Sequence, residues 1–596
     1  MPRSALFLSL ALLLSPAGPL VAAEPACPEA PLAAGVQALS AHQGDGGAAF
    51  SAFRRATAEA ARSGGMAAVA ARIAALNSGQ PVGEGDAGLA SCLLRAYVRA
   101  RYGERIVRDL QEMLGFQTFA IPGKDNWSAP EFLRQRQWLR GRAAALGLEF
   151  KDYDGRVDEI TLPGPKPVLA LLVHGDVQDV AGQTWLAPPF AGRKIGDRIV
   201  GRGTEDDKGP AIAALYTLAA LKDAGWPLGA TVRLVIANGE ETSWDEIPYY
   251  LARASMPDMT VGLDAAYPVT HAQKGYGILT FRPGKPATSA TSAISATSAT
   301  SARPGRFRVV RVSGGSGVSI IPESGEALLA PAAPGLNPEA AVSELSRLAT
   351  EWAKKHPPAR LSVSREGEQV KIVALGKGGH SSEPRSGHNA LGDLTAFLAT
   401  LDLTLDPPGA LATFLGNALG TETDGQSLGL LHHDDETGNL TANLSLFKEE
   451  KGLPPIPEAV VNIRPPRGLP KPEIERRLAE RTTLFAKRTG IPMTVEVEIS
   501  TEPHVAPVDG KLVRSLLAVW REVTGTPGKP IAVGGGTQAR LFPGGVDFGP
   551  AMSMEHYRGH GTDEYMTVDE LLRVAELTTA AVWRLVGIAN PLSPTP

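Results

Sequence analysis

The chain has 596 residues, of which 43% are hydrophobic and 20% are charged, an ordinary composition for a globular protein. This length allows two to four domains. The net charge of -4 excludes the strongly basic footprint of a nucleic-acid-binding protein and gives no support for binding at a membrane surface. We therefore expect neither a nucleic-acid partner nor a membrane span in the mature protein.

The first residues have the pattern of a secretory signal peptide. Arg3 supplies a short basic start, residues 5–14 form an apolar core, and residues 21–23 (Val-Ala-Ala) form a small-residue cleavage site. The apolar run is short for a transmembrane helix, which disfavours an uncleaved anchor. The sequence therefore predicts a signal peptide over residues 1–23 and a protein exported to the periplasm or secreted.

Residues 24–95 are rich in Ala and Gly with helical spacing and are predicted as a helical N-terminal extension without chemistry of its own. The two cysteines of the chain, Cys27 and Cys92, both lie in it. Export makes a disulfide chemically possible. We favour a Cys27–Cys92 disulfide over the alternative of two unpaired thiols, and neither cysteine has the spacing of a metal site.

Residues 96–269 alternate between strand and helix patterns. VLALLVHGD (168–176) is a continuous apolar run that ends in polar residues, as a buried parallel strand does. GPAIAALYTLAALKDAG (209–225) is an Ala/Leu-rich helix that begins at a proline, and TVRLVIANGEE (231–241) is a second buried strand. This strand–helix–strand order predicts an α/β sheet, in which ligands bind beyond the carboxyl ends of the strands.

Residues 270–503 have the mixed pattern of an α+β unit, and residues 504–596 return to the helix–strand alternation. Within the former, residues 285–304 are low-complexity Ala/Thr/Ser sequence, which predicts a surface loop. The order is explained if an α+β lid, 270–503, is inserted into a catalytic α/β domain made of 96–269 and 504–596. The predicted fold is thus a mixed sheet sandwiched by helices, with an inserted lid domain.

Acidic and histidine residues gather where the predicted strands end. His174 and Asp176 follow the first strand and lie on the same side of an extended chain. Glu240 and Glu241 follow the second strand and point in opposite directions, so that one can bind a metal and the other a water. Asp264 follows a further strand. Each pattern is weak when taken singly, because the first pair can occur by chance and the two glutamates can belong to a solvated acidic turn.

Together the motifs resemble a known family. The order HGDV, GRGTEDDKG, NGEE, LDA, GGHSSEP, GGGT and HGTDEYM resembles the dinuclear-zinc metallopeptidases of the aminoacylase, carnosinase and carboxypeptidase G clan. GRGTEDDKGP, DAAYPV, EPHVAP and VNIRPP are similar to the PepV-like dipeptidase branch in particular. The resemblance covers residues 96 to 585 or so. Each motif is modest alone, but the whole set in this order and spacing is specific.

The resemblance implies a pair of metal ions and assigns their ligands. One ion takes His174 and Asp264, the other takes His560 and Glu241, and Asp206 bridges the two. Zinc accepts such a mixed nitrogen and oxygen shell, and manganese or cobalt are alternatives for a shell rich in carboxylates. Two dications facing three carboxylates and one bridging hydroxide also balance in charge.

The resemblance also implies the catalytic and substrate-binding residues. Glu240 is the general base, and Asp176 supports the first metal site through His174 or through the bridging acid. His380, in the inserted lid, polarises the scissile carbonyl. Arg464 holds the substrate carboxylate, a task that suits a planar bidentate donor. Gly536 and Thr537, in the GGGT loop, approach the substrate closely.

Other residues are expected to do less. In GRGTEDDKGP, Glu205 is expected at the rim and Asp207 is expected to fix the turn with its carboxylate directed away from the metals. Five further histidines are not expected to bind metal. His432 and His433 lie in a polar turn, and the glycines beside His560 argue against the helix that would pair it with His556. His388 and His504 either line the cleft or, as we favour, have a packing role.

The sequence therefore predicts an exported, metal-dependent dipeptidase that hydrolyses dipeptides or very short peptides with a water bound to two zinc ions. Two alternatives stay open: an N-acyl-amino-acid deacylase of the same clan, and a non-catalytic binding protein on the same scaffold. We expect a monomer, because a lid within the same chain can supply His380. The side-chain preference of the enzyme is not predicted.

Overall fold

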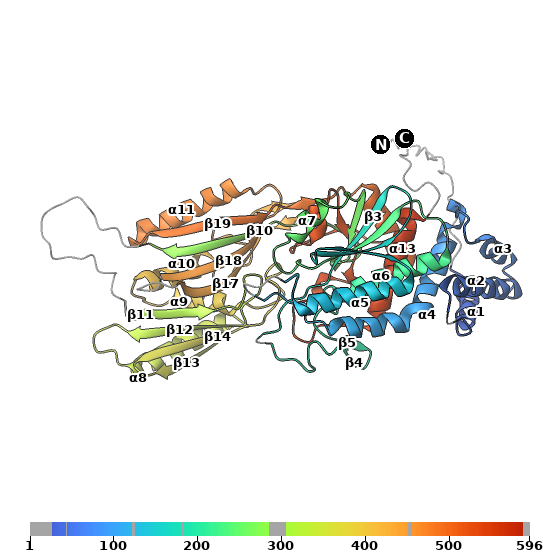
Figure 1. Ribbon diagram of the computed structural model, residues 1–596. Coiled ribbons are helices and arrows are strands. Elements are labelled where there is room, and N and C mark those ends of the chain that lie inside the picture. Colours follow the sequence, from blue (N-terminus) through green and yellow to red (C-terminus); the bar gives the residue numbers. More distant parts are fainter. Residues whose placement is uncertain are drawn as a thin grey trace, which may run out of the picture.

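The computed structural model describes residues 27–587 apart from residues 43, 122–125, 182, 285–304 and 451–455. The predicted signal peptide, 1–23, and the low-complexity segment, 285–304, lie outside the described residues. The described chain is elongated: two large β-sheets lie one after the other along its length, and the N-terminal helices lie at one end (Figure 1). No helix within the described ranges is long and apolar enough to cross a bilayer.

The first sheet is a mixed nine-stranded sheet. Its order is β1–β2–β6–β3–β7–β22–β9–β20, with β21 paired to β9. The central strand β3 is parallel to β6 and β7, and β22 is parallel to β7, whereas β2 is antiparallel to β6. The strands are β1 (Glu149–Tyr153), β2 (Val157–Leu162), β3 (Val168–His174), β6 (Thr231–Ala237), β7 (Met259–Gly262), β9 (Thr270–Gln273), β20 (His504–Val505), β21 (Ile531–Val533) and β22 (Val546–Asp547). Every residue of β3 is buried, as its continuous apolar run predicts.

Helices cover both faces of this sheet. One face packs against a layer built from α4 (Ala87–Leu114), α6 (Lys208–Ala224), α12 (Lys511–Thr524) and α13 (Val568–Val586), with α5 (Pro130–Leu146) beside it. The other face packs against α7 (Glu246–Leu251) and the short helix η2 (Gln538–Leu541). The predicted sandwich of helices around a mixed sheet is therefore confirmed. We call this part of the molecule the catalytic unit.

The N-terminal extension is helical, with α1 (Glu29–Leu39), α2 (Gly46–Ser63), α3 (Ala67–Ala75) and the short helix η1 (Glu84–Asp86). A disulfide joins Cys27, just before α1, to Cys92 in α4, as we favoured from the sequence. α4 runs without a break across residue 95, where the sequence placed the end of the extension. This one helix therefore belongs to both parts, because it packs against α1 as well as against α6 and α13.

The second sheet has eight strands, all paired antiparallel, in the order β13–β14–β12–β11–β17–β18–β10–β19. They are β10 (Tyr276–Pro283), β11 (Phe307–Gly314), β12 (Ser324–Pro331), β13 (Arg360–Glu366), β14 (Gln369–Leu375), β17 (Thr441–Glu450), β18 (Ile456–Arg464) and β19 (Met493–Thr501). Its helices are α8 (Pro338–Lys355), α9 (Ala390–Leu398), α10 (Pro407–Ala418) and α11 (Lys471–Thr489). This lid has its own hydrophobic core.

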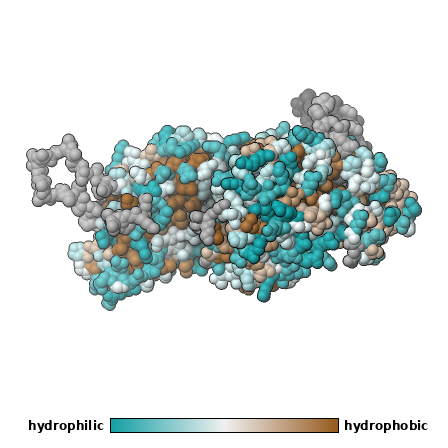
Figure 2. All heavy atoms as spheres, viewed as in Figure 1, coloured by the Kyte–Doolittle hydropathy of each residue, from teal (hydrophilic) through white to brown (hydrophobic). Residues whose placement is uncertain are grey.

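Short strand pairs complete the fold. They are β4 (Arg193–Ile195) and β5 (Arg198–Val200) with β24 (Tyr565–Thr567), β8 (Ala265–Ala266) with β23 (Pro550–Ala551), and β15 (His433–Asp434) with β16 (Gly438–Asn439). The short helix η3 (Met554–His556) precedes His560. On the visible face, hydrophilic side chains cover most of the catalytic unit, whereas hydrophobic ones gather near the middle of the lid (Figure 2).

The strand pairing shows where the chain passes between the two sheets. β9 falls inside the range predicted for the lid, 270–503, but it pairs with β20, β21 and β22 of the catalytic sheet. The lid sheet begins only at Tyr276 and ends at Thr501. The two crossings are therefore Lys274–Gly275 and Glu502–Pro503, and the predicted start of the lid at residue 270 lies a few residues early.

Candidate metal centre and active site

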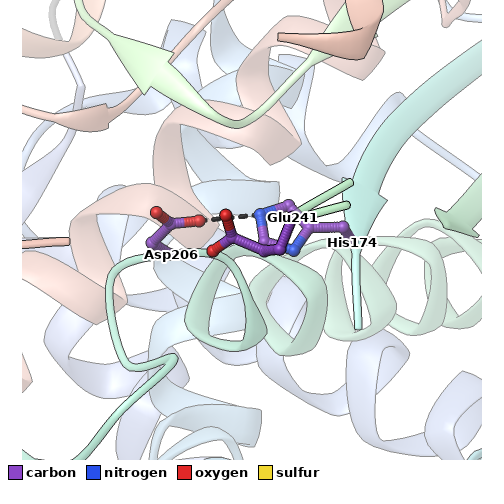
Figure 3. A group of neighbouring side chains, drawn as sticks. All are labelled: His174, Asp206 and Glu241. Carbon is purple, nitrogen blue, oxygen red and sulfur yellow. Dashed lines mark hydrogen bonds and ion pairs between the residues drawn. The ribbon is translucent and has the colours of Figure 1, made fainter. Parts of the chain in front are cut away.

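Three of the predicted metal ligands, His174, Glu241 and Asp264, lie at or just after the carboxyl ends of the neighbouring parallel strands β3, β6 and β7. His174 is the last residue of β3, Glu241 follows β6, and Asp206 lies in the turn before α6. Figure 3 shows the side chains of His174, Asp206 and Glu241 pointing toward one another. Parallel strands bring their carboxyl ends to one edge of the sheet, which explains how residues far apart in sequence meet.

Asp206 lies between two histidines, with one carboxylate oxygen toward each. Its Oδ1 is 2.7 Å from Nε2 of His174, and its Oδ2 is 3.0 Å from Nε2 of His560. Nε2 of His560 is also 2.9 Å from Oε1 of Glu241, and Nε2 of His174 is 3.8 Å from Oδ1 of Asp264. The five predicted ligands therefore converge, and Asp206 directs one carboxylate oxygen toward each of the two histidines.

Asp207 differs from its prediction. Its carboxylate is not directed away: Oδ2 accepts a hydrogen bond of 3.1 Å from the backbone N–H of His174, and the side chain is fully buried. Ligand-type atoms of His174, Asp207 and Asp264 lie within 4.8 Å of one another. The peptide bond between Asp206 and Asp207 is cis. Asp207 therefore lies under the first metal position and holds the backbone of His174.

Glu205 is also placed differently. Its side chain is 3% exposed, not at a rim, and a carboxylate oxygen accepts a hydrogen bond from the backbone N–H of Arg558. Burial raises the pKa of Glu205 to about 8. Hydrogen bonding to the loop that carries His560 explains why an acid that binds no metal is buried here.

The electrostatics of the cluster fit divalent cations. In the protein alone, burial and then the charge of Asp264 raise the pKa of Glu240 well above its usual value, and burial raises that of Asp264 to about 6. Burial also disfavours the charge of Asp206, but His560 and His174 together hold its pKa well below the usual value. Carboxylates crowded in this way repel each other unless positive charge lies between them. Two histidine nitrogens and several carboxylates are a donor set that zinc accepts.

The imidazole of His174 is oriented for metal binding. Its Nδ1 donates a hydrogen bond of 3.0 Å to the backbone carbonyl of Asp176, so Nε2, which faces Asp206, is the nitrogen that would bind a metal. The carboxylate of Asp176 accepts the backbone N–H groups of Glu240 at 3.2 Å and of Glu241 at 3.1 Å. Asp176 thus lies where its supporting role was predicted, and it also fixes the turn that carries the predicted base.

Two supporting residues were missed by the sequence analysis. The buried carboxylate of Glu564 accepts the backbone N–H groups of Gly203, Glu205 and Asp206 at 2.9–3.1 Å. It also pairs with Arg202 at 2.7 Å. The hydroxyl of Tyr557 donates to Oδ2 of Asp206. The only sequence feature that pointed to Glu564 is its place after His560 in the HGTDE motif. Nothing in the sequence indicated a role for Tyr557.

His380 of the lid reaches the metal centre. It lies in the segment between β14 and α9, and its ring centroid is 5.7 Å from that of His560. Nδ1 accepts a hydrogen bond of 3.2 Å from the backbone N–H of Ser382, so the neutral ring carries its proton on Nε2. Burial, followed by the charges of Arg464 and His560, lowers the pKa of His380 well below its usual value. His380 is therefore a neutral hydrogen-bond donor beside the metal ligands.

Arg464, at the end of β18, is 4% exposed. Its Nε donates to Oδ1 of Asn462 at 3.1 Å, and its guanidinium lies 4.6 Å from the ring centroid of Tyr276. Within the described residues the two terminal nitrogens of Arg464 make no hydrogen bond or ion pair. Asn462 also accepts the hydroxyl of Ser381 at 2.7 Å, which links Arg464 to the residue next to His380.

Gly536 and Thr537, the two residues of the GGGT loop predicted to approach the substrate, differ in whether they have a free hydrogen-bond donor. The backbone N–H of Gly536 makes no hydrogen bond to any described residue, so it is available to a ligand. Thr537 is buried and uses both donors internally: its N–H donates to Gln273 at 3.0 Å, and its hydroxyl donates to Asp547. Thr537 therefore has no free N–H or O–H group for the predicted substrate contact. Its hydrogen bonds to Gln273 and Asp547 instead hold the loop in place.

The remaining histidines make local contacts. His388 bonds to the buried Asp393, His504 bonds to the backbone carbonyl of Gly545, and His433 bonds to Asn439 in an exposed lid hairpin. None of them is part of the groups of metal-type ligands found among the described residues.

The donor set and its position at the strand ends define the class as a metal-dependent hydrolase of α/β type. The family model for peptidase family M20/M25/M40 matches residues 170–584, so the chain belongs to this peptidase family. A curated relative, the Beta-Ala-Xaa dipeptidase of Lactobacillus delbrueckii subsp. lactis, is 29% identical over 439 residues, covering 73% of this chain and 85% of the relative.

Two solved structures are also similar. Human carnosine dipeptidase 1 has 15% identity and a TM-score of 0.48, with 82% of this chain and 97% of that chain covered. The dipeptidase Dug1p from Saccharomyces cerevisiae has 10% identity and a TM-score of 0.48, with 83% and 98% covered. At such identity neither structure bears on the substrate of this protein.

Proposed function

We propose that the protein is an exported dipeptidase that uses two divalent cations, with zinc as the first choice and manganese or cobalt as alternatives. The observation that carries the proposal is Asp206, one oxygen of which faces His174 and the other His560. The relative with Beta-Ala-Xaa dipeptidase activity in its name supports a dipeptide as substrate. His174 and Asp264 would hold one cation, and His560 and Glu241 the other.

When bound, the cations lower the pKa of water and polarise the scissile carbonyl. Glu240 takes the proton from the attacking water and passes it to the leaving amine. Its backbone is held for this task, because its N–H bonds to Asp176 and its carbonyl accepts Nε1–H of Trp244 at 2.6 Å. His380 donates its Nε2 proton in a hydrogen bond to the oxyanion that develops in the transition state.

Arg464 would select short substrates. Its free guanidinium nitrogens suit the planar carboxylate of a C-terminal residue. The hydrogen bonds from Ser381 and Arg464 to Asn462 fix Arg464 relative to His380. A carboxylate bound here places the preceding peptide bond near His380 and the metal ligands, so the distance between the two residues limits the length of the substrate.

The alternative is an N-acyl-amino-acid deacylase, which would use the same base and the same carboxylate site. A panel of dipeptides and N-acetyl amino acids, assayed with enzyme loaded with zinc, manganese or cobalt, separates the two. We expect hydrolysis of Ala-Ala and related dipeptides. Hydrolysis of N-acetylalanine without hydrolysis of dipeptides would replace the dipeptidase proposal by the deacylase, and no hydrolysis of either would favour a binding protein.

Export and oligomeric state are part of the proposal. The signal-peptide pattern of residues 1–23 and the Cys27–Cys92 disulfide both suit an oxidising compartment outside the cytoplasm. Cell fractionation and the N-terminal sequence of the mature protein test this; a cytoplasmic protein that keeps residue 1 would contradict it. A monomer is supported because His380 reaches His560 within the same chain, and light scattering on the purified protein measures the mass.

A further inference from the structure

Three cationic side chains gather where the chain crosses between the two sheets. Arg540, in η2 of the catalytic unit, donates through Nη2 to the backbone carbonyls of Lys274, at 2.9 Å, and of Glu502. Arg540 therefore binds both crossings at once. The backbone N–H of Gly275 donates to the carbonyl of Pro465 at 2.8 Å, which joins the residue after Lys274 to the residue after Arg464. We call Lys274, Arg464 and Arg540 the cationic junction.

Two of the three side chains, Lys274 and Arg464, are buried and have charged ends whose donors the described residues do not use. Lys274 is 8% exposed and Arg464 is 4% exposed. Across the described residues, Nζ of Lys274 and the terminal nitrogens of Arg464 make no hydrogen bond or ion pair. None of these nitrogens is among the fully enclosed side-chain atoms that lack a partner, so they keep contact with solvent and can be reached by a ligand.

The surrounding charge does not compensate the junction. Glu383 is close enough to oppose the loss of charge on both Lys274 and Arg464, but Arg385 adds positive charge beside Lys274. Burial lowers the pKa of Lys274, and it lowers the pKa of Arg464 and of Arg540 to about 10 each. Two carboxylates, Glu383 and Asp547, therefore stand against four cations, and the site has room for more negative charge.

A series of contacts leads from His560 through Arg464 to the residue next to Lys274, and the charges of Arg464 and Lys274 are close enough to interact. The ring centroids of His560 and His380 are 5.7 Å apart, and Ser381 and Arg464 both donate to Asn462. Pro465 then contacts Gly275, next to Lys274. A dipeptide with its scissile bond at His380 and its α-carboxylate at Arg464 would extend the side chain of its C-terminal residue toward Lys274.

We infer that Lys274 forms, together with Arg464, a cationic subsite for a second carboxylate of the substrate, so that the enzyme prefers dipeptides whose C-terminal residue is glutamate or aspartate. This inference rests on the proposed dipeptidase function. Arg540 acts as a positioning residue, because it holds the backbone of Lys274. The α-carboxylate of a neutral dipeptide supplies one negative charge, whereas an acidic C-terminal residue supplies a second.

The experiment uses isosteric substrate pairs on the mature, metal-loaded enzyme. We expect kcat/KM for Ala-Glu to exceed that for Ala-Gln by about tenfold or more, and Ala-Asp to exceed Ala-Asn similarly, since a charged hydrogen bond contributes about 1.5–3 kcal/mol. Lys274→Gln should bring the Ala-Glu to Ala-Gln ratio close to one. The matched control is Lys511→Gln, at an exposed position at the start of α12, which should leave the ratio unchanged.

The results distinguish a failure of the proposed subsite from a failure of the proposed dipeptidase function. If wild type hydrolyses Ala-Gln as well as Ala-Glu, the subsite is wrong while the dipeptidase function stands. If Lys274→Gln lowers kcat/KM for both substrates by the same factor, Lys274 has only a structural role and the inference fails. If wild type hydrolyses no dipeptide, both proposals fail together.

A measurement on wild type alone covers the case in which Lys274→Gln does not fold. Free glutamate and glutamine are compared as competitive inhibitors of Ala-Ala hydrolysis at low and high salt. We expect glutamate to inhibit at about a tenfold lower concentration, since it alone reaches Lys274 with a second carboxylate. Equal inhibition constants would overturn the subsite.

Discussion

The candidate active site contains two clusters of opposite charge. The metal edge is formed by His174, Asp206, Glu241, Asp264 and His560. The cationic junction is formed by Lys274, Arg464 and Arg540. At the first, buried carboxylates crowd together and raise the pKa of Asp264 and Glu240. At the second, Lys274 and Arg464 have unused donors, and burial lowers the pKa of all three cations. Neither cluster is balanced by the protein itself. We therefore propose a partner of opposite charge for each: divalent cations at the metal edge and substrate carboxylates at the cationic junction.

The largest expected effect is at the metal edge, where Glu240→Gln removes the proposed base but keeps the shape of the side chain. We expect kcat to fall by about 10²–10⁴-fold, the usual contribution of general acid–base catalysis. The metal content, measured by plasma mass spectrometry, should stay close to that of wild type, because Glu241 and not Glu240 is the proposed ligand. Wild-type turnover in this variant would refute the mechanism.

Asp206→Ala should abolish activity for a different reason, the loss of metal. The variant removes the carboxylate that faces both His174 and His560, and with it a ligand shared by the two cations. The matched control is Glu205→Gln, one residue earlier, which should keep its metal because Glu205 bonds to the backbone of Arg558. Equal metal contents in the two variants after dialysis would show that Asp206 is not the bridge.

The sequence alone predicted the metal edge better than its surroundings. His174, Glu241 and Asp264 follow strands whose apolar runs are clear, and parallel strands bring such ends together by a general rule. The family resemblance then separated Asp206 from its acidic neighbours. The mixed sheet between helices was predictable for the same reason, since strand and helix patterns alternate along residues 96–269.

The predictions that were wrong concern residues whose surroundings depend on contacts between distant segments. Glu205 and Asp207 look like solvated acids in the sequence, and only the approach of Arg558 and the backbone of His174 explains why they are buried. Lys274 and Arg540 carried no signal, because their proximity depends on the backbone hydrogen bonds at the two crossings between sheets. The predicted start of the lid was a few residues early, since β9 is too short to show which sheet it joins.

At the cationic junction, Arg464→Met should weaken binding of the α-carboxylate. We expect kcat/KM for Ala-Ala to fall by about 10–10²-fold, from the loss of charged hydrogen bonds of about 1.5–3 kcal/mol. Arg464→Lys should recover only part of this, since lysine lacks the planar fork. Ala-Ala amide, which has no carboxylate, provides the control. The substitution should change its hydrolysis little. An equal fall in kcat/KM for Ala-Ala and Ala-Ala amide would contradict a carboxylate-binding role.

The smallest effect concerns pH and stability beside the metal edge. Burial raises the pKa of Glu205 from its usual 4.5 to about 8 in the folded protein. Between these two values the folded chain holds a proton at Glu205 that the unfolded chain has released. The free energy of unfolding contributed by Glu205 therefore falls as pH rises through this window, and it is fully present only below the unfolded pKa.

Glu205→Gln removes this titration while keeping an oxygen that can accept the N–H of Arg558. The melting temperature of the variant, compared with that of wild type in metal-free buffer, should therefore improve steadily from pH 5 to pH 8 or so, by several degrees. A matched substitution on the exposed surface of the same unit, Glu149→Gln on β1, should show a difference that does not change with pH. If the difference in melting temperature between Glu205→Gln and wild type does not change with pH, Glu205 is ionised in the folded protein. Its burial would then require a cation beside it, as at the metal edge.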